Sequence, residues 1–162
     1  MSNVLHSVLA IAVLTVFGTS TAVAQRPAIK NSRDTTPSGV VRAYVAAFNV
    51  KDLDAMIEQV APDLEWMSVA GDSVVVGGRR ASAFRQLLAG YFREVPSARS
   101  ELLAVHVTGA WVTTHEQTRW TVSASGVSGQ SSVVVYEVRD GLVRRVWFYP
   151  PITHRGAAND GR

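Results

Sequence analysis

The chain contains no cysteine, and this absence removes several classes of protein at once. Without a thiol there is no disulfide scaffold, no thiolate metal site, no cysteine nucleophile and no lipid on an N-terminal cysteine. Charge is also sparse: 18% of the 162 residues are Asp, Glu, Lys or Arg, whereas 47% are hydrophobic. Such an apolar fraction excludes a disordered chain, and the length suits one globular domain with its own core.

Basic residues do not cluster along the sequence. Lys and Arg number 16 against 13 Asp and Glu, which gives a net charge of +3. The basic doublets are Arg79-Arg80 and Arg144-Arg145, and neither lies in a basic or aromatic-rich run. Nucleic-acid recognition needs a clustered positive surface, so we expect no nucleic-acid partner.

Residues 1–24 contain no Asp, Glu, Lys or Arg. An apolar stretch over residues 8–17 leads to small residues that end in Ala22-Val23-Ala24, the pattern of a secretory signal peptide cleaved after Ala24. The apolar run of roughly ten to fourteen residues is shorter than the roughly 20 that span a bilayer, so we expect no stable membrane anchor. The predicted location is the periplasm or the cell exterior. Because Lys and Arg are missing before the apolar stretch, an uncleaved anchor or a different start stays open as an alternative.

The rest of the chain is predicted to hold one domain. Residues 25–37 are polar and contain two prolines, which is typical of a flexible leader. The folded domain is expected over residues 38–150. Residues 151–162 lack an apolar pattern and are expected to form a flexible tail.

Apolar periodicity predicts an α+β fold. Helical spacing indicates three helices: one capped by Ser38, a short one over residues 52–60, and one capped by Ser82. Alternation with a period of two then predicts a series of strands, at residues 64–69, 73–76, 100–107, 111–122, 131–139 and 142–149. We expect about three N-terminal helices packed on one face of a curved, mainly antiparallel β-sheet.

The last two predicted strands are joined by Asp140-Gly141, a strong signal for a two-residue hairpin turn. An unbroken register from this turn pairs Glu137 with Arg144, Val135 with Val146 and Val133 with Phe148. That register also places Tyr136 and Trp147 on the other, outer face. Both faces would be largely apolar, so we expect a homodimer through the outer face, with Tyr136 and Trp147 in the interface.

Several segments resemble a known family. The stretches 40–49, 51–57 and 61–66 resemble the opening of the nuclear-transport-factor-2-like superfamily, which includes ketosteroid isomerases and SnoaL-like polyketide cyclases. Gly77-Gly78-Arg79 and the closing hairpin over residues 136–145 resemble the SnoaL-like branch. The resemblance covers residues 38–149 and implies a cone-shaped fold with a concave pocket. Because this fold hosts enzymes, binding modules and scaffolds, it does not by itself name a function.

Ketosteroid isomerase chemistry does not carry over to this sequence. Tyr44 falls where the isomerases place the tyrosine that donates to the developing oxyanion. Their general-base aspartate falls at Ser68, and their protonated aspartate falls at about Val135. A serine does not abstract a carbon-bound proton unaided, and a valine donates no hydrogen bond.

The resemblance also places candidate residues around the pocket. Glu116 shares a strand face with Thr114 and Thr118, where a raised pKa would suit acid–base work; pairing with an arginine or a place at the solvated rim are the alternatives. For Glu137 the alternative is an ordinary cross-strand ion pair with Arg144. The catalytic candidates are Glu116 and Tyr44, and the ligand-binding candidates are Trp66, Ser68, Phe84, Leu88, Tyr91, Thr114, Thr118, Val135, Glu137 and Phe148.

No cofactor or metal is expected. The histidines that follow the predicted cleavage site, at 106, 115 and 154, have no short ligand spacing. Gly77-Gly78 stands alone and does not make a glycine-rich phosphate cradle.

Three functions therefore remain open. The first, favoured by the missing isomerase base, is an exported protein that binds a small, largely apolar molecule without assured catalysis. The second is an isomerase, cyclase or dehydratase in which Glu116 is the acid–base group and Tyr44 polarises a carbonyl. The third is a dimeric interaction domain without a ligand. A desolvated Glu116 inside the pocket would favour the second, and a filled cone would favour the third.

Overall fold

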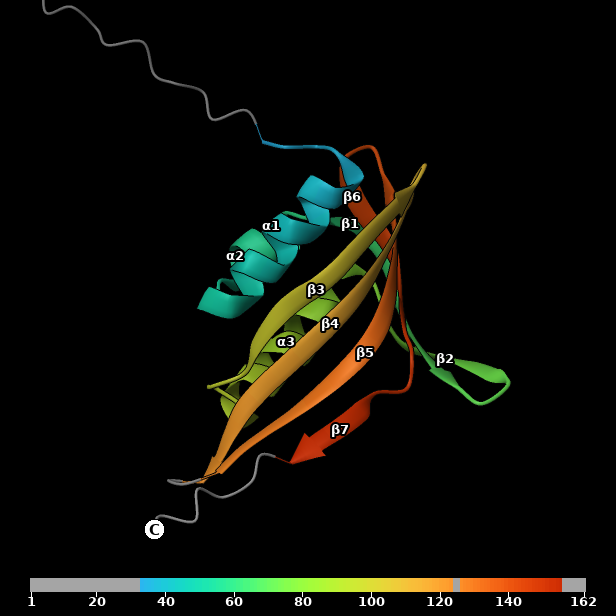
Figure 1. Ribbon diagram of the computed structural model, residues 1–162. Coiled ribbons are helices and arrows are strands. Elements are labelled where there is room, and N and C mark those ends of the chain that lie inside the picture. Colours follow the sequence, from blue (N-terminus) through green and yellow to red (C-terminus); the bar gives the residue numbers. More distant parts are fainter. Residues whose placement is uncertain (1–32, 124–125, 156–162) are drawn as a thin grey trace, which may run out of the picture. The chain divides into compact units, whose positions relative to one another are not determined.

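The computed structural model describes residues 33–123 and 126–155. This part of the chain is a mixed α+β fold, in which three helices pack on a curved seven-stranded sheet (Figure 1). The elements in chain order are α1 (Pro37–Val50), α2 (Leu53–Ile57), β1 (Val60–Ala70), β2 (Ser73–Arg79), α3 (Ala81–Glu94), β3 (Arg99–Thr108), β4 (Trp111–Ser123), β5 (Gly126–Arg139), β6 (Leu142–Phe148) and β7 (Ile152–Arg155).

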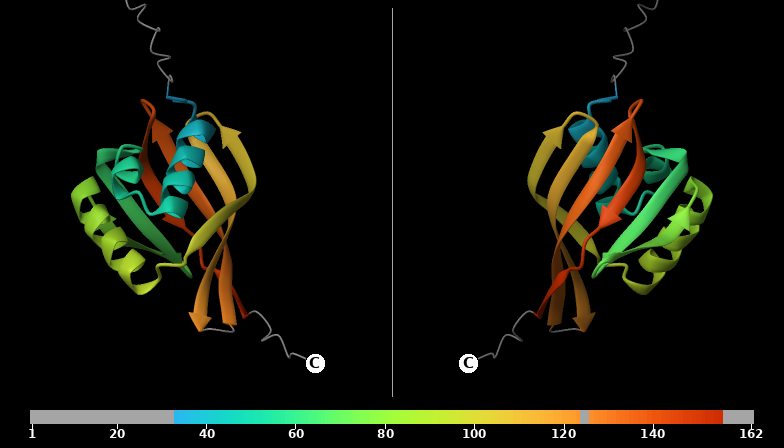
Figure 2. Two further views of the ribbon diagram at one scale, coloured as in Figure 1. Left: turned by 90° about the vertical axis from the view of Figure 1, so that its left-hand side faces the viewer. Right: turned by 90° about the vertical axis from the view of Figure 1, so that its right-hand side faces the viewer.

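The sheet has the strand order β2-β1-β6-β5-β4-β3, and β7 pairs with β5. Every neighbouring pair is antiparallel except β1 and β6, which run parallel. The helices lie on one side of the sheet, here named the inner face (Figure 2, left). On the opposite side, the outer face, none of the helices in the described residues covers the strands (Figure 2, right).

The helix boundaries differ from the predicted ones at specific residues. Thr36 caps α1 by accepting a hydrogen bond from the Gly39 backbone, so Ser38 is not the cap. The third helix has Arg80 at its N-cap position without a side-chain cap, which makes the prediction of Ser82 wrong. The second helix is shorter than residues 52–60, because β1 already begins at Val60.

Strand β1 contains a proline, Pro62, close to its start. The β1–β6 ladder pairs Val60 with Val143 and Glu65 with Arg145, and its register is broken between these two pairs. Pro62 lies within that break, where its missing N–H removes no ladder hydrogen bond.

The core fills the space between the helices and the inner face. Both layers contribute fully buried side chains, as the helical and alternating periodicities require. The largest are Tyr136, Phe84, Met56, Leu64, Val40, Val41, Val112, Val134, Val143 and Val146.

The β5–β6 hairpin contains a β-bulge that overturns part of the predicted register. The turn has Asp140 at φ 54° and Gly141 at φ 70°, as a tight two-residue hairpin requires. Beyond Val138↔Val143 the ladder shifts, so Glu137 pairs with Arg145 and not with Arg144. The predicted pairs Val135–Val146 and Val133–Phe148 are wrong for the same reason; the observed pairs are Tyr136↔Val146, Val135↔Trp147 and Val134↔Phe148.

Because of this bulge, the side chains of β5 lie on the opposite faces of the sheet from those predicted. Side chains alternate along a strand, so one extra residue in the partner strand changes which of them share a face with β6. Tyr136 therefore lies on the inner face, buried in the core, and does not belong to an outer interface. Val135 and Glu137 lie on the outer face, paired with Trp147 and Arg145.

The predicted signal peptide (1–24), most of the leader (25–32) and the end of the tail (156–162) lie outside the described residues. Residues 152–155 of the predicted tail form β7, which pairs with β5 between Ser128 and Ser131. Strand β7 lies beside β5 just beyond the last residue of β6 in the ladder, Phe148. Main-chain hydrogen bonds therefore hold these residues in a strand, although their sequence has no apolar pattern. No helix within residues 33–123 and 126–155 has both the length and the apolar character needed to cross a bilayer.

Candidate functional site

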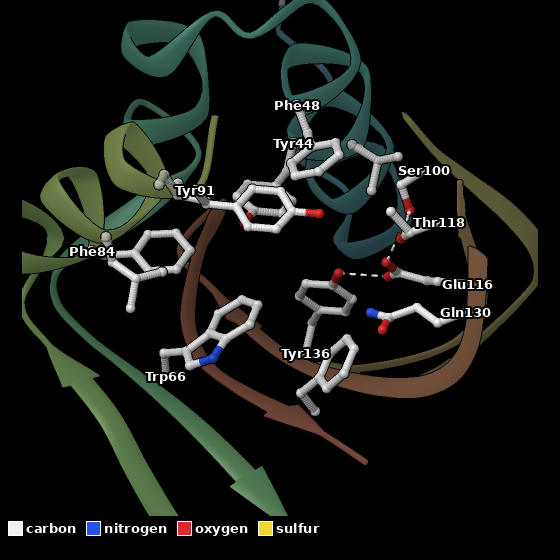
Figure 3. Close-up of a pocket in the computed structure, with 14 residues that line it drawn as sticks. Tyr44, Phe48, Trp66, Phe84, Tyr91, Ser100, Glu116, Thr118, Gln130 and Tyr136 are labelled. Atoms are coloured by element: carbon white, nitrogen blue, oxygen red, sulfur yellow. Dashed lines mark hydrogen bonds between the residues drawn. The ribbon is translucent and has the colours of Figure 1, made fainter. Parts of the chain in front are cut away.

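A cavity of about 170 Å³ lies between the helices and the inner face of the sheet. Its walls come from α1, α3 and strands β1, β3, β4, β5 and β6 (Figure 3). Aromatic and aliphatic side chains predominate among the lining residues, which are Tyr44, Val45, Phe48, Trp66, Phe84, Leu87, Leu88, Tyr91, Ser100, Glu116, Thr118, Gln130, Tyr136 and Phe148.

Aromatic rings form a nearly continuous wall. The ring of Trp66 stacks on Phe84, with centroids 5.1 Å apart, and on Phe148 at 6.2 Å. Tyr44 lies 6.2 Å from Tyr136 with the rings edge to face, and 6.4 Å from Phe84. Such walls favour a flat, apolar ligand and keep water away from the polar groups beside it.

The carboxyl group of Glu116 is the charged group of this cavity. The residue is 9% exposed, and its Oε1 accepts hydrogen bonds from the hydroxyls of Tyr136, at 2.6 Å, and Thr114, at 2.8 Å. Its Oε2 has one longer contact, 3.4 Å, with the hydroxyl of Ser100. No Lys, Arg or His lines the cavity in the described residues, so Glu116 is neither paired with an arginine nor placed at a solvated rim.

Burial raises the pKa of Glu116, because the charged form loses its hydration. The hydrogen bonds from Tyr136, Thr114 and Ser100 favour the ionised form and oppose this shift, but burial outweighs them. A carboxyl group with a raised pKa exchanges its proton closer to neutral pH than an exposed one.

Two cavity tyrosines remain protonated as hydrogen-bond donors. Burial, and then the negative charge of Glu116, raise the pKa of both Tyr44 and Tyr136. The Tyr136 hydroxyl is engaged by Glu116, whereas the Tyr44 hydroxyl has no partner within the described part of the chain. Since every fully buried side-chain nitrogen or oxygen there has a partner, the Tyr44 hydroxyl must be open to the cavity.

The end of α1 positions Ser100 beside Glu116. The Asn49 side chain donates from Nδ2 to the Ser100 carbonyl at 2.8 Å and accepts from the Ser100 backbone N–H at 2.7 Å. This two-way pairing holds the first residues of β3 against the helix, and the Thr118 hydroxyl donates to Ser100 Oγ at 3.3 Å. Hydrogen bonds from Asn49 and Thr118 therefore fix the position of Ser100 on the polar side of the cavity.

The structure divides the predicted site residues into three groups. Two do not line the cavity but lie next to it: Thr114 lies beneath Glu116 and donates to it, and Ser68 follows Trp66 on the same strand face and pairs with Phe148. Two lie on the other side of the sheet, as the bulge requires: Val135 and Glu137. The predicted residues that line the cavity are Tyr44, Trp66, Phe84, Leu88, Tyr91, Glu116, Thr118 and Phe148.

Glu137 is an ion-pair residue of the outer face. Its carboxylate accepts from Arg139, at 2.6 Å, and from Arg145, at 3.1 Å. The predicted partner Arg144 instead contacts Asp63 and Asp140. Glu137 therefore has a structural role in place of the predicted ligand contact.

Six lining residues were missed by the sequence analysis. Val45, Phe48 and Leu87 belong to helical apolar patterns, so their spacing could have placed them with their neighbours. Tyr136 was assigned to the wrong face because the bulge leaves no sequence signal of its own. Ser100 and Gln130 are ordinary polar strand residues, and only the pairing of three strands brings them to the cavity.

Among the described residues, no group of three or more His, Asp or Glu side chains is arranged to hold a metal ion.

Comparisons with known proteins agree on the domain type. A family model described as SnoaL-like domain matches residues 41–146. No curated protein matches the sequence.

Solved structures with the same fold have low sequence identity. A cystatin-fold protein from Novosphingobium aromaticivorans is 22% identical with a TM-score of 0.60, over 70% of this chain and 97% of that one. IdmH, a proposed polyketide cyclase from Streptomyces antibioticus, is 22% identical with a TM-score of 0.61, over 73% and 91%. An epoxide hydrolase of the LEH-like kind from M. tuberculosis is 22% identical with a TM-score of 0.54, over 68% and 78%. At such identities the likeness establishes the fold alone.

Proposed function

The chain belongs to the SnoaL-like domain family, and from this premise we propose that it is an enzyme of the isomerase, cyclase or dehydratase kind. Its substrate is a small, largely apolar carbonyl compound that binds in the cavity. One observation carries the proposal: the Glu116 carboxyl group is buried inside an aromatic cavity without a basic partner. A fold that only packs a core has no reason to bury an unpaired carboxyl group, whereas an acid–base catalyst needs one.

The two oxygens of Glu116 suggest how the proton moves. Oε1 is held by two short hydrogen bonds, which orient the carboxyl group. Oε2 has a single long contact and is the atom that accepts a proton from the substrate. In an isomerisation or a cyclisation, Glu116 then returns this proton to a second atom of the substrate. In a dehydration, Glu116 gives the proton to the departing hydroxyl, which leaves as water.

Tyr44 is suited to polarise the substrate carbonyl. Its hydroxyl is open to the cavity, and its raised pKa keeps the proton on the phenol. A neutral donor beside the carbonyl oxygen stabilises the negative charge that develops when the neighbouring carbon loses its proton.

The cavity limits the size of the ligand. An engineered cavity of about 150 Å³ holds a benzene molecule, so about 170 Å³ suits a compound of one ring. Binding without chemistry is the second candidate function, because the stacked aromatic wall of Trp66, Phe84 and Phe148 suffices to hold such a ring.

Proton exchange on a simple ketone separates the two functions. Cyclohexanone is incubated with the protein in deuterated water, and loss of the protons next to the carbonyl is followed by NMR. We expect Glu116→Gln to slow the catalysed exchange by more than about a hundredfold while cyclohexanone affinity stays within about threefold. Glu101→Gln, which removes an exposed carboxylate of β3 outside the cavity, is the matched control and should exchange at the wild-type rate.

Two results would contradict the catalytic proposal. Exchange by Glu116→Gln at the wild-type rate would remove Glu116 from the mechanism. Binding of cyclohexanone by the wild type without exchange above the buffer rate would favour the binding function instead.

We also propose that a second copy of the chain covers the outer face. Trp111, which is 39% exposed, and Trp147 lie with their ring centroids 5.5 Å apart on this face, and Val133 beside them is 44% exposed. An exposed aromatic pair of this kind is typical of an interface. Tyr136, which the sequence assigned to the same interface, is excluded by its place in the core. Export of the protein also stays a proposal, which rests on residues 1–24 alone.

A further inference from the structure

A row of three polar side chains crosses the inner face beside Glu116. Ser100 of β3 is paired with Thr118 of β4, and Thr118 is paired with Gln130 of β5. All three line the cavity, and we name them the polar row (Figure 3). Glu116 lies two residues from Thr118 on β4, so the carboxyl group and the polar row point into the same space.

The hydrogen bonds of the polar row leave one group unused. The Thr118 hydroxyl donates to Ser100 Oγ, and the Ser100 hydroxyl contacts Glu116 Oε2. The Gln130 carboxamide, by contrast, has no hydrogen-bond partner in residues 33–123 and 126–155. Because every fully buried polar side-chain atom of that part is satisfied, the amide is open to the cavity, beside Glu116 in Figure 3.

The polar groups of the cavity lie mainly on the strands. Ser100, Thr118 and Gln130 belong to strands, whereas α3 presents the side chains of Phe84, Leu87 and Leu88 and one phenol, Tyr91. An anionic ligand would meet the carboxyl group of Glu116 without a compensating cation among the described lining residues, which is unfavourable in a buried site. A neutral ligand with an apolar ring and oxygens on its polar side fits this arrangement.

The strand pairing indicates how far the second oxygen lies from the reacting carbon. Gln130 pairs with Thr118, two residues from Glu116, so Gln130 and Glu116 are diagonal neighbours on adjacent strands, about 7–8 Å apart at the backbone. A six-membered ring can place one carbon at Glu116 and an oxygen on its opposite side at Gln130. A carboxamide both donates and accepts, so Gln130 can hold a hydroxyl or a carbonyl oxygen. A site that leaves such a group unpaired discriminates against ligands that cannot bond to it.

We infer that the substrate is a neutral six-membered ring compound with two oxygen functions: a carbonyl whose oxygen lies at Tyr44 and whose neighbouring carbon lies at Glu116, and a second oxygen held by Gln130 of the polar row. This inference rests on the proposed function, since it names the substrate class of the same cavity. Gln130 is then a specificity-determining residue: it selects the doubly oxygenated ring and takes no part in the proton transfer.

Binding of four ring compounds tests the inference without any turnover. Dissociation constants are measured by NMR titration for cyclohexanone, 4-hydroxycyclohexanone, 4-oxocyclohexanecarboxylate and cyclohexylamine. We expect the wild type to bind 4-hydroxycyclohexanone about tenfold more tightly than cyclohexanone and the carboxylate most weakly. Gln130→Leu should remove the tenfold preference, so that this variant binds the two ketones with equal affinity.

The matched control is Gln117→Leu on the neighbouring strand. Gln117 pairs with Glu101 and Ser131 and does not line the cavity, so this variant should keep the wild-type preference. Equal affinity of the wild type for the two ketones, or a preference that survives in Gln130→Leu, would overturn the inference. Tightest binding of cyclohexylamine would also overturn it, because the site would then select a cation.

Failure of this inference is distinguishable from failure of the proposed function. Proton exchange on cyclohexanone depends on Glu116 and needs no second oxygen, so loss of the binding preference would leave the exchange result intact. Absence of exchange would likewise leave the binding preference measurable.

Discussion

The hydroxyl of Tyr136 donates a hydrogen bond of 2.6 Å to Oε1 of Glu116. The two residues lie on neighbouring strands, β5 and β4, and both are buried on the inner face. This bond lowers the pKa of Glu116 while burial raises it, so the balance between them determines the pH at which the carboxyl group can work.

Replacing Tyr136 with Phe should therefore move the pH dependence of catalysis. Without the donor, the ionised form of Glu116 loses a stabilising contact, and its pKa rises further. The midpoint of the rise of cyclohexanone exchange with pH should shift to higher pH. Tyr149→Phe, at a tyrosine outside the cavity, is the control. An unchanged midpoint in Tyr136→Phe would mean that this hydrogen bond does not tune Glu116.

The raised pKa of Glu116 also predicts how stability depends on pH. Between the ordinary glutamate pKa of about 4.3 and the higher folded value, the native protein keeps a proton that the unfolded chain has released. The free energy of unfolding of the wild type therefore falls as pH rises through this window. Glutamine cannot titrate, so Glu116→Gln should lose this part of the pH dependence.

Differential scanning calorimetry between about pH 4 and about pH 8 measures this effect. The melting temperature of Glu116→Gln minus that of the wild type should become more positive as pH increases. Glu101→Gln again serves as the control for the loss of one carboxyl group. A constant difference between Glu116→Gln and the wild type would contradict the raised pKa.

Two adjacent glycines offer a matched test of the aromatic wall. A Cβ on Gly77 would lie 3.1 Å from Cδ1 of Trp66, whereas a Cβ on Gly78 would meet nothing within 4 Å. Gly77→Ala should shift the Trp66 indole beside Phe84 by a few tenths of an ångström, weaken cyclohexanone binding several-fold, and cost about 1 kcal/mol of stability. Gly78→Ala should bind as the wild type does. Equal cyclohexanone affinities for the two variants would show that Trp66 adjusts its position without weakening ligand binding.

The proposed dimer depends on the outer aromatic pair. Trp147→Ala removes one ring of the Trp111–Trp147 pair and should shift the protein toward monomer in sedimentation velocity runs at low micromolar concentration. Val75→Ala, which removes an exposed side chain from the β2 strand, should leave the sedimentation behaviour unchanged. The same mass for Trp147→Ala and the wild type would argue against this interface.

Much of the architecture could be predicted from local patterns. Helical spacing places Val40, Val41 and Tyr44 on one buried face, because a helix presents every third or fourth residue on the same side. Asp140-Gly141 forms the predicted turn because its backbone torsions are a property of those two residues. The α+β class and the resemblance to SnoaL-like proteins are confirmed for the same reason: they rest on the order and periodicity of the elements.

The faces of β5 could not be predicted in this way. Because side chains alternate along a strand, Val135 and Tyr136 must point to opposite sides of the sheet. This alternation does not indicate which of the two points toward the helices. That choice depends on one extra residue near Arg144, whose side chain is held outside the ladder by Asp63 and Asp140. Strand β6 also pairs with β1, which lies far along the chain, so no local pattern contains this information.

The sequence by itself determined the helices and strands other than β7, the fold class, the family, and Glu116 and Tyr44 as candidates for chemistry. The tertiary structure decided that Tyr136 bonds to Glu116, that Glu137 faces away, and that Ser100, Thr118 and Gln130 form one polar row. The physical reason is the range of the interactions. Periodicity is set by neighbours in the chain, whereas register is set by pairing between distant strands, and a shift of one residue reverses which side chains reach the cavity.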